Sequence, residues 1–179
     1  LYVGVEVLAG DAIGTYGKSM GMSLDQTKYF TTFTLLAMLL GYIIGIFTIP
    51  RYLSQQKALQ ASALLGLILC GGIYFSDGYL AITLIALLGL ANALMWPAIF
   101  PLAIDGLGKH TQVGSALLIM GIAGGALIPL LYGFLKDSLK LPNNLSFFMV
   151  SFPAYVYILY YALAGHKAGR ASLATLPQS

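Results

Sequence analysis

Charged residues are scarce in this sequence of 179 residues. They make up 8% of the chain, whereas hydrophobic residues make up 59%. Soluble domains carry about 25% charged residues, so the composition argues against a protein that is surrounded by water. The nine basic and six acidic residues are scattered between apolar runs and form no basic block that could follow a phosphate backbone. We therefore expect no nucleic-acid partner.

Cysteine and histidine are also nearly absent. The only cysteine is Cys70, so the chain has no disulfide framework, and His110 and His166 do not belong to any metal-binding pattern. The sequence contains no Ser-His-Asp arrangement, no HExxH motif and no phosphate-binding glycine loop. We expect the protein not to be an enzyme and to need neither a metal ion nor a cofactor.

Long apolar runs are what the chain has instead. A bilayer core about 30 Å thick needs about 20 helical residues, and the runs lack the period-2 alternation of a membrane barrel. The predicted fold is an all-α integral membrane bundle at residues 1–165, followed by a polar tail at 166–179. We expect the chain to begin inside a helix, because Leu1 already starts an apolar run. The six predicted spans are 1–17, 28–49, 58–75, 79–104, 113–135 and 145–165.

Two Gly-xxx-Gly motifs indicate where helices pack closely. Gly41 and Gly45 lie in the second run and Gly121 and Gly125 in the fifth, and small residues at this spacing let helix backbones approach each other. Both motifs are followed by an Ile-Pro pair, which ends at Pro129 in the fifth run. This pattern is typical of two inverted three-helix repeats, although two short matches in glycine-rich helices also arise by chance.

Acidic residues occur inside only one apolar run, where they are Glu6 and Asp11. An ionised side chain inside a bilayer costs several kcal/mol unless it faces a cavity or a partner, so both are candidates for charge coupling. Five residues separate them, which turns them about 140° apart on a helix. We predict that Glu6 lies near the midplane and lines a substrate site; alternatively, it is a buried acid satisfied by a neighbouring helix, and Asp11 is an interfacial residue.

Further candidates lie in the second and fourth runs. Asn92 and Trp96 share a helical face at i and i+4, and an indole beside an amide suits a sugar, although Trp96 also suits plain packing. Pro97 and Pro101 follow and should kink the helix. Thr34, Met38 and Tyr42 form a stripe at helical spacing that lines the same predicted cavity, unless the threonine bonds to its own backbone.

Residues 93–120 read ALMWPAIFPLAIDGLGKHTQVGSALLIM, followed by GIAGGALIPLLYGFLKD. This segment resembles the C-terminal half of fucose and glucose/galactose symporters of the major facilitator superfamily. The resemblance extends to Leu1-Tyr2-Val3-Gly4 and to Pro50-Arg51-Tyr52-Leu53 with Lys57, and so covers nearly the whole chain. It implies proton-coupled import of a hexose by alternating access, with the missing N-terminal six-helix half, a proton and the lipid bilayer as partners.

The same resemblance implies where coupling and specificity reside. In this family the carboxylates credited with proton coupling lie in the N-terminal half, so that role does not pass directly to Glu6. The fucose branch tends to have an arginine where this sequence has Tyr42, which favours the glucose/galactose branch. Two alternatives remain open: an integral membrane enzyme acting on a lipid substrate, and a non-transporting sugar-binding receptor.

The resemblance also implies a multi-pass protein of the bacterial plasma membrane with a cytoplasmic tail. The charge distribution agrees with this orientation, because five basic residues fall on the side of the tail and four on the other. The five are Arg51, Lys57, Lys109, Lys167 and Arg170, and the four are Lys18, Lys28, Lys136 and Lys140.

Overall fold

The computed structural model describes residues 1–19, 21–49 and 51–168, and all regular secondary structure in these ranges is helical. Pro50 and residues 169–179, which include most of the predicted polar tail, lie outside the described residues. Five segments are long and apolar enough to cross a bilayer, namely Thr27–Thr48, Gln55–Tyr74, Gly78–Ile104, Gly108–Ser138 and Asn143–Leu163. The first helix is shorter and more polar. The prediction of an all-α membrane bundle is confirmed.

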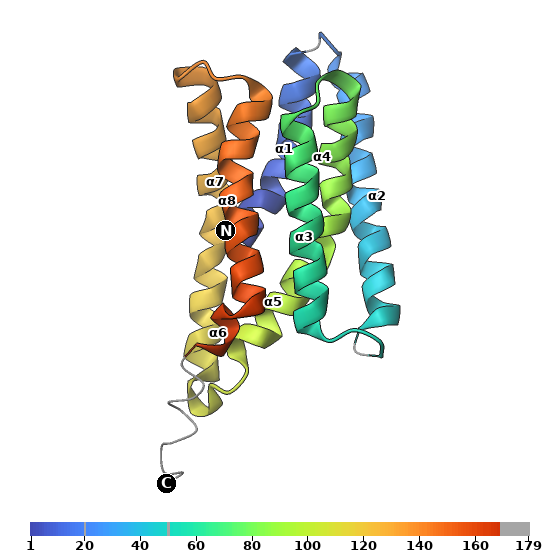
Figure 1. Cartoon of the computed structure of the whole chain (residues 1–179). Coiled ribbons are helices and arrows are strands. Elements are labelled where there is room, and N and C mark those ends of the chain that lie inside the picture. Colours follow the sequence, from blue (N-terminus) through green and yellow to red (C-terminus); the bar gives the residue numbers. More distant parts are fainter. Residues whose placement is uncertain (20, 50, 169–179) are drawn as a thin grey trace.

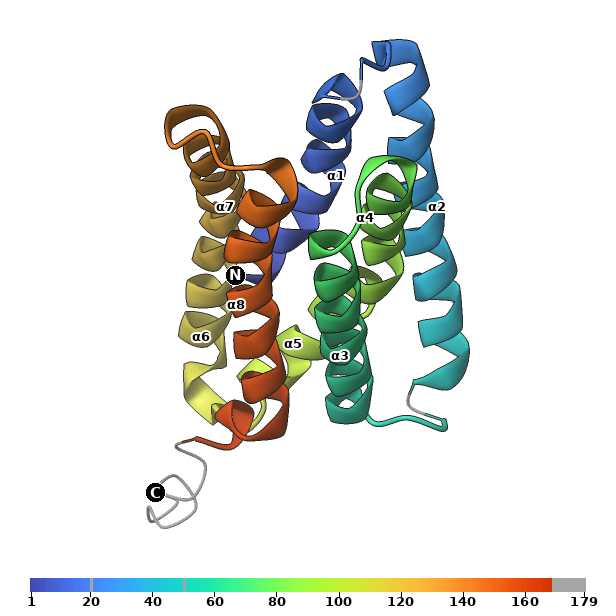
Figure 2. The same ribbon diagram turned by 45° about the horizontal axis from the view of Figure 1, so that its top comes forward.

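Eight α-helices form the bundle in the described part of the chain. They are α1 (Tyr2–Ser19), α2 (Leu24–Thr48), α3 (Gln55–Tyr74), α4 (Gly78–Ala93), α5 (Met95–Ile104), α6 (Thr111–Met120), α7 (Gly124–Gly133) and α8 (Asn143–Leu163). Figures 1 and 2 show that successive spans run in opposite directions and that the N-terminal end of α1 lies at mid-height of the bundle. The third helix starts at a Ser54 cap, whose side chain accepts a hydrogen bond from the Lys57 amide.

The fourth span is broken into two helices. α4 ends at Ala93 and α5 begins at Met95, so the break falls at Leu94, before the two prolines of α5. Because Pro97 has no N–H group, it cannot donate to the carbonyl of Ala93, four residues earlier, and the helix loses a hydrogen bond at this point. The axis therefore changes direction at Leu94, and α5 crosses the lower part of the bundle in Figure 1.

The fifth span is interrupted as well. A 3₁₀ turn, η2 (Gly121–Ala123), separates α6 from α7, and Pro129 lies within α7. A π turn over Phe134–Ser138 ends the span. Interruptions of this kind within a helix often mark points at which the helix can bend.

The helix contacts reproduce the predicted three-plus-three repeat. The first span packs against the fifth and the sixth. In the same way, the fourth span packs against the second and the third. The first and fourth spans contact each other, as do the third and sixth. Exchanging the two sets of three spans therefore maps these contacts onto one another. Equivalent spans run in opposite directions, so the repeat is inverted.

Glycines allow the closest crossings in both repeats. A Cβ atom on Gly89 of α4 would overlap the backbone carbonyl of Thr34 in α2. A Cβ atom on Gly4 of α1 would lie 2.7 Å from the carbonyl oxygen of Gly124 at the start of α7. Each crossing thus depends on a bare helix surface, which is how membrane helices gain packing energy without a hydrophobic drive.

Candidate sugar cavity

Glu6 lies on α1, one helical turn after Tyr2, and is partly buried. The Tyr2 phenol and the Glu6 carboxylate lie close enough to interact with each other. Spacing of four residues brings the two side chains together on one face of the helix. A phenol can donate to a carboxylate inside an apolar helix, where an isolated charge would be costly.

A cavity of about 220 Å³ opens beside this pair. Its walls come from four elements of the bundle, α1, α2, η2 and α5, and consist of Tyr2, Val3, Glu6, Tyr42, Trp96 and Ile122. One acid, two phenols and an indole therefore surround a space that is otherwise apolar. A few polar groups placed in an apolar pocket are the usual composition of a small-molecule site.

Aromatic rings form one wall of the cavity. The rings of Tyr2 and Trp96 are stacked, with centroids 6.1 Å apart and an angle of 16° between their planes. Trp96 also contacts Phe100, whose ring centroid is 5.7 Å away. The C–H face of a sugar packs on aromatic surfaces of this kind, while its hydroxyl groups need hydrogen-bond partners such as a carboxylate.

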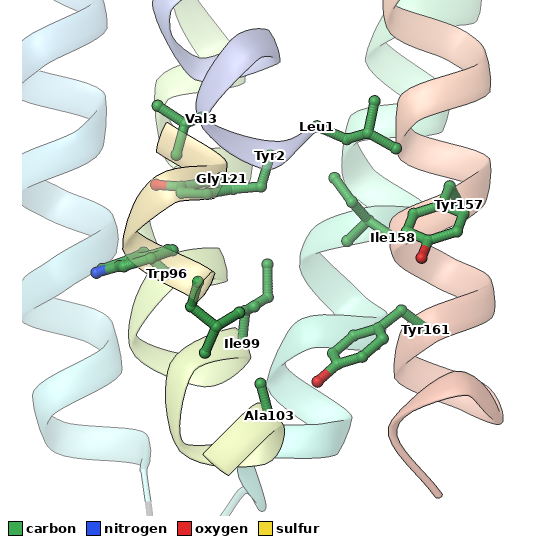
Figure 3. Close-up of a pocket in the computed structure, with 11 residues that line it drawn as sticks. Leu1, Tyr2, Val3, Trp96, Ile99, Ala103, Gly121, Tyr157, Ile158 and Tyr161 are labelled. Atoms are coloured by element: carbon green, nitrogen blue, oxygen red, sulfur yellow. The ribbon is translucent and has the colours of Figure 1, made fainter. Parts of the chain in front are cut away.

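A second cavity of about 250 Å³ lies on the other side of this aromatic wall. Figure 3 shows it beneath the start of α1, with Ile99 and Ala103 of α5 on one side and Tyr157 and Tyr161 of α8 on the other. Tyr2, Val3 and Trp96 line both cavities. The lining is mostly apolar and includes no carboxylate, so this space suits a hydrophobic segment better than a sugar.

Asn92 lies outside the cavity, although its spacing places it on the same predicted face as Trp96. Its side chain is 1% exposed, and its Oδ1 atom accepts a hydrogen bond of 2.8 Å from the Tyr155 hydroxyl. The i, i+4 rule holds only on a continuous helix, and the break at Leu94 puts Asn92 on α4 and Trp96 on α5. The bend thus turns the two side chains in different directions.

Of the predicted stripe on α2, only Tyr42 reaches the cavity. Thr34 is buried, its hydroxyl donates to the Phe30 carbonyl, and its own carbonyl contacts Gly89. Met38 also packs on Gly89. Residues spaced by four drift around a helix, so Tyr42 lies roughly 80° from Thr34, which faces α4.

The remaining predicted residues take other positions. Asp11 is exposed on α1, outside the cavity. Gly41 and Gly45 pack against Ala93 and Leu94 respectively, at the end of the fourth span.

The glycines of the fifth span differ from each other. Gly125 packs against Val3 and Val7 of α1, whereas no atom lies within 4 Å of a Cβ built on Gly121, which lines the cavity of about 250 Å³.

Tyr2, Val3 and Ile122 line the cavity beside Glu6 but were not predicted from the sequence. Tyr2 precedes Glu6 by one turn, and this spacing could have identified it. In the described part of the chain, no three His, Cys, Asp or Glu side chains converge as metal ligands do.

Comparisons with known proteins find sugar transporters and symporters among the relatives of this chain. It is 33% identical over 171 residues to the glucose/galactose transporter of Brucella abortus, a match that covers 94% of this chain and 40% of that protein. It is 27% identical over 169 residues to the L-fucose-proton symporter of Haemophilus influenzae, covering 93% of this chain and 39% of the relative. The L-fucose-proton symporter of Escherichia coli is 28% identical over 139 residues, 76% of this chain and 32% of the relative.

No family model and no solved structure matches the chain. The curated relatives are named as transporters and symporters, not as enzymes, in agreement with the sequence prediction. The chain spans about 40% of the length of the transporter from Brucella abortus. Over nearly its whole length the chain is homologous to glucose/galactose transporters and L-fucose-proton symporters, in agreement with the resemblance seen in its sequence.

Proposed function

We propose that the chain forms the C-terminal half of a secondary transporter that imports a hexose by proton symport. The observation that carries the proposal is the cavity in which Glu6, Tyr42 and Trp96 meet from three different helices. Relatives that match nearly the whole chain are named as a glucose/galactose transporter and as L-fucose-proton symporters, which supports a hexose as substrate and a proton as coupling ion.

The size of the cavity supports a site shared with a second half. Its volume of about 220 Å³ is below the 300 Å³ or so at which small-molecule pockets usually begin, and this chain does not fully enclose it. The N-terminal six-helix half would close it from the other side. Alternating access then consists of the two halves rocking about a sugar held between them.

Two features support the choice of sugar and the orientation of the chain in the membrane. Tyr42 lines the cavity at the position where the fucose branch tends to carry an arginine, which favours glucose or galactose over fucose. Arg51, Lys57 and Lys109 lie in or beside the links at one end of the bundle, the end toward which α8 runs. We assign this end to the cytoplasm of a bacterial cell, by the excess of basic residues that cytoplasmic links carry.

Uptake by the full-length protein in proteoliposomes tests the proposal. Radiolabelled glucose, galactose and fucose are supplied in turn, with and without an imposed inward proton gradient. We expect accumulation of glucose or galactose that depends on the gradient. Binding of a hexose without any counterflow would identify a non-transporting receptor instead, and gradient-independent equilibration would contradict proton symport.

A further inference from the structure

Tyr155 and Asn92 form a buried pair deep in the bundle. The Tyr155 side chain is 0% exposed, and its hydroxyl donates a hydrogen bond of 2.8 Å to Asn92 Oδ1. The Nδ2 atom of Asn92 has no partner among the described residues. The bond from Tyr155 is therefore what orients the amide, and without it the whole polar group would be buried unsatisfied.

The pair joins two spans by way of a third. Tyr155 belongs to α8, which packs along α3, while Asn92 belongs to α4. The Tyr155 ring reaches α4 across Gly66 of α3: a Cβ atom added to Gly66 would lie only 2.5 Å from the ring. A glycine at this position thus provides the space in which the tyrosine lies.

The position of Asn92 links its hydrogen bond with Tyr155 to the break in the fourth span. Asn92 lies two residues before Leu94, where the fourth span breaks, and its carbonyl accepts from the Leu94 amide that ends α4. Trp96, the stacked wall of the sugar cavity, follows within the first turn of α5. Any change in the direction of α5 at the break therefore moves the indole relative to Glu6 on α1.

We propose that Tyr155 is a positioning residue: its hydrogen bond to Asn92, over the bare surface of Gly66, fixes the bend of the fourth span and so places Trp96 in the sugar cavity. This inference rests on the proposed function for its effect on sugar uptake. Its effect on the position of Trp96 does not depend on transport. In this arrangement the packed helices α3 and α8 hold the break in place, and the direction of α5 depends on them.

Tyr155→Phe in the full-length protein tests the proposal, because phenylalanine keeps the ring and removes only the hydroxyl. Two properties are measured: the ¹⁹F NMR signal of 5-fluorotryptophan at position 96, assigned with Trp96→Phe, and the KM and kcat of hexose uptake. We expect the Trp96 signal to shift or split and the KM to rise about tenfold, a loss of about 1.4 kcal/mol. The matched control is Tyr160→Phe, an exposed tyrosine on the same helix, which should change neither property.

A double-mutant cycle keeps the test decisive if a single variant folds poorly. In an Asn92→Leu background the hydroxyl has no partner, so adding Tyr155→Phe should cause no further change in the Trp96 signal or in KM. Additive effects would overturn the proposal, and so would an unchanged Trp96 signal and KM in Tyr155→Phe. If the signal shifts while the wild-type protein transports no hexose, the proposed function fails and the positioning role stands.

Discussion

Replacing Glu6 by alanine is expected to weaken hexose uptake without unfolding the bundle. The carboxylate lines the cavity beside Tyr2, so a bound sugar would donate one hydroxyl to it. A hydrogen bond to a charged group contributes about 1.5–3 kcal/mol. Since each 1.4 kcal/mol or so is a factor of ten, the KM of Glu6→Ala should rise about 10- to 150-fold.

The thermal stability of Glu6→Ala is not expected to fall, although its uptake of hexose should. Removing a carboxylate from an apolar helix removes the cost of holding a charge inside the bilayer, so the thermal midpoint of Glu6→Ala should stay the same or rise. Glu6→Gln keeps the shape and a hydrogen-bond acceptor without the charge, and its KM should lie between those of the wild type and Glu6→Ala. This separation distinguishes a ligand contact from a structural role.

The assay is initial-rate uptake of radiolabelled glucose and galactose by the full-length protein in proteoliposomes, with the thermal midpoint measured on the same preparations. Asp11→Asn is the matched control, because Asp11 is an exposed carboxylate on the same helix outside the cavity. Equal KM values for the wild type and Glu6→Ala would refute the assignment of Glu6. A large drop in thermal midpoint would instead make Glu6 a packing residue.

Three further outcomes are expected. Trp96→Leu should raise the KM about 2- to 12-fold through loss of aromatic stacking worth about 0.5–1.5 kcal/mol, while Trp96→Phe should have a smaller effect; equal uptake by both would contradict a stacking role. Gly89→Ala should lower the free energy of unfolding, measured by chemical denaturation, by about 1–3 kcal/mol, because the new Cβ overlaps the Thr34 carbonyl. The control Gly71→Ala meets no atom within 4 Å and should leave this free energy unchanged or raise it. Tyr42→Arg should place a cation in the cavity that pairs with the acid there, so glucose uptake should fall more than uptake of fucose, measured by competition.

Local signals in the sequence found the residues that stand out from their surroundings. An acid inside an apolar run and an indole beside two prolines are both visible in a single sequence, and the structure brings Glu6 and Trp96 to the same cavity. The long apolar runs likewise revealed the membrane fold, because bilayer thickness fixes the length of a span. The glycine pairs indicated close packing only in part: Gly41, Gly45 and Gly125 contact neighbouring helices, whereas Gly121 does not, and the closest crossings lie at Gly4 and Gly89.

Sequence reasoning failed where a side chain's direction depends on an interruption of the helix. Asn92 and Trp96 would share a face on an unbroken helix, but the break at Leu94 separates them. The stripe beginning at Thr34 was misjudged because residues spaced by four rotate gradually, and only Tyr42 faces the cavity. Ile122 could not have been predicted as a cavity residue, because its place depends on how the fifth span packs against the first.

The two sides of the cavity come from spans that are equivalent in the inverted repeat but differ in continuity. The first and fourth spans are equivalent in the repeat, yet α1 is one continuous helix that carries Glu6, whereas the fourth span is broken and carries Trp96 beyond its break. α1 packs against both α4 and α7, so the acid is held from two sides. The indole is held by α5, whose direction depends on the bend at Leu94. Divergence of the two repeats has thus placed an acid on a continuous helix opposite an indole that follows a break.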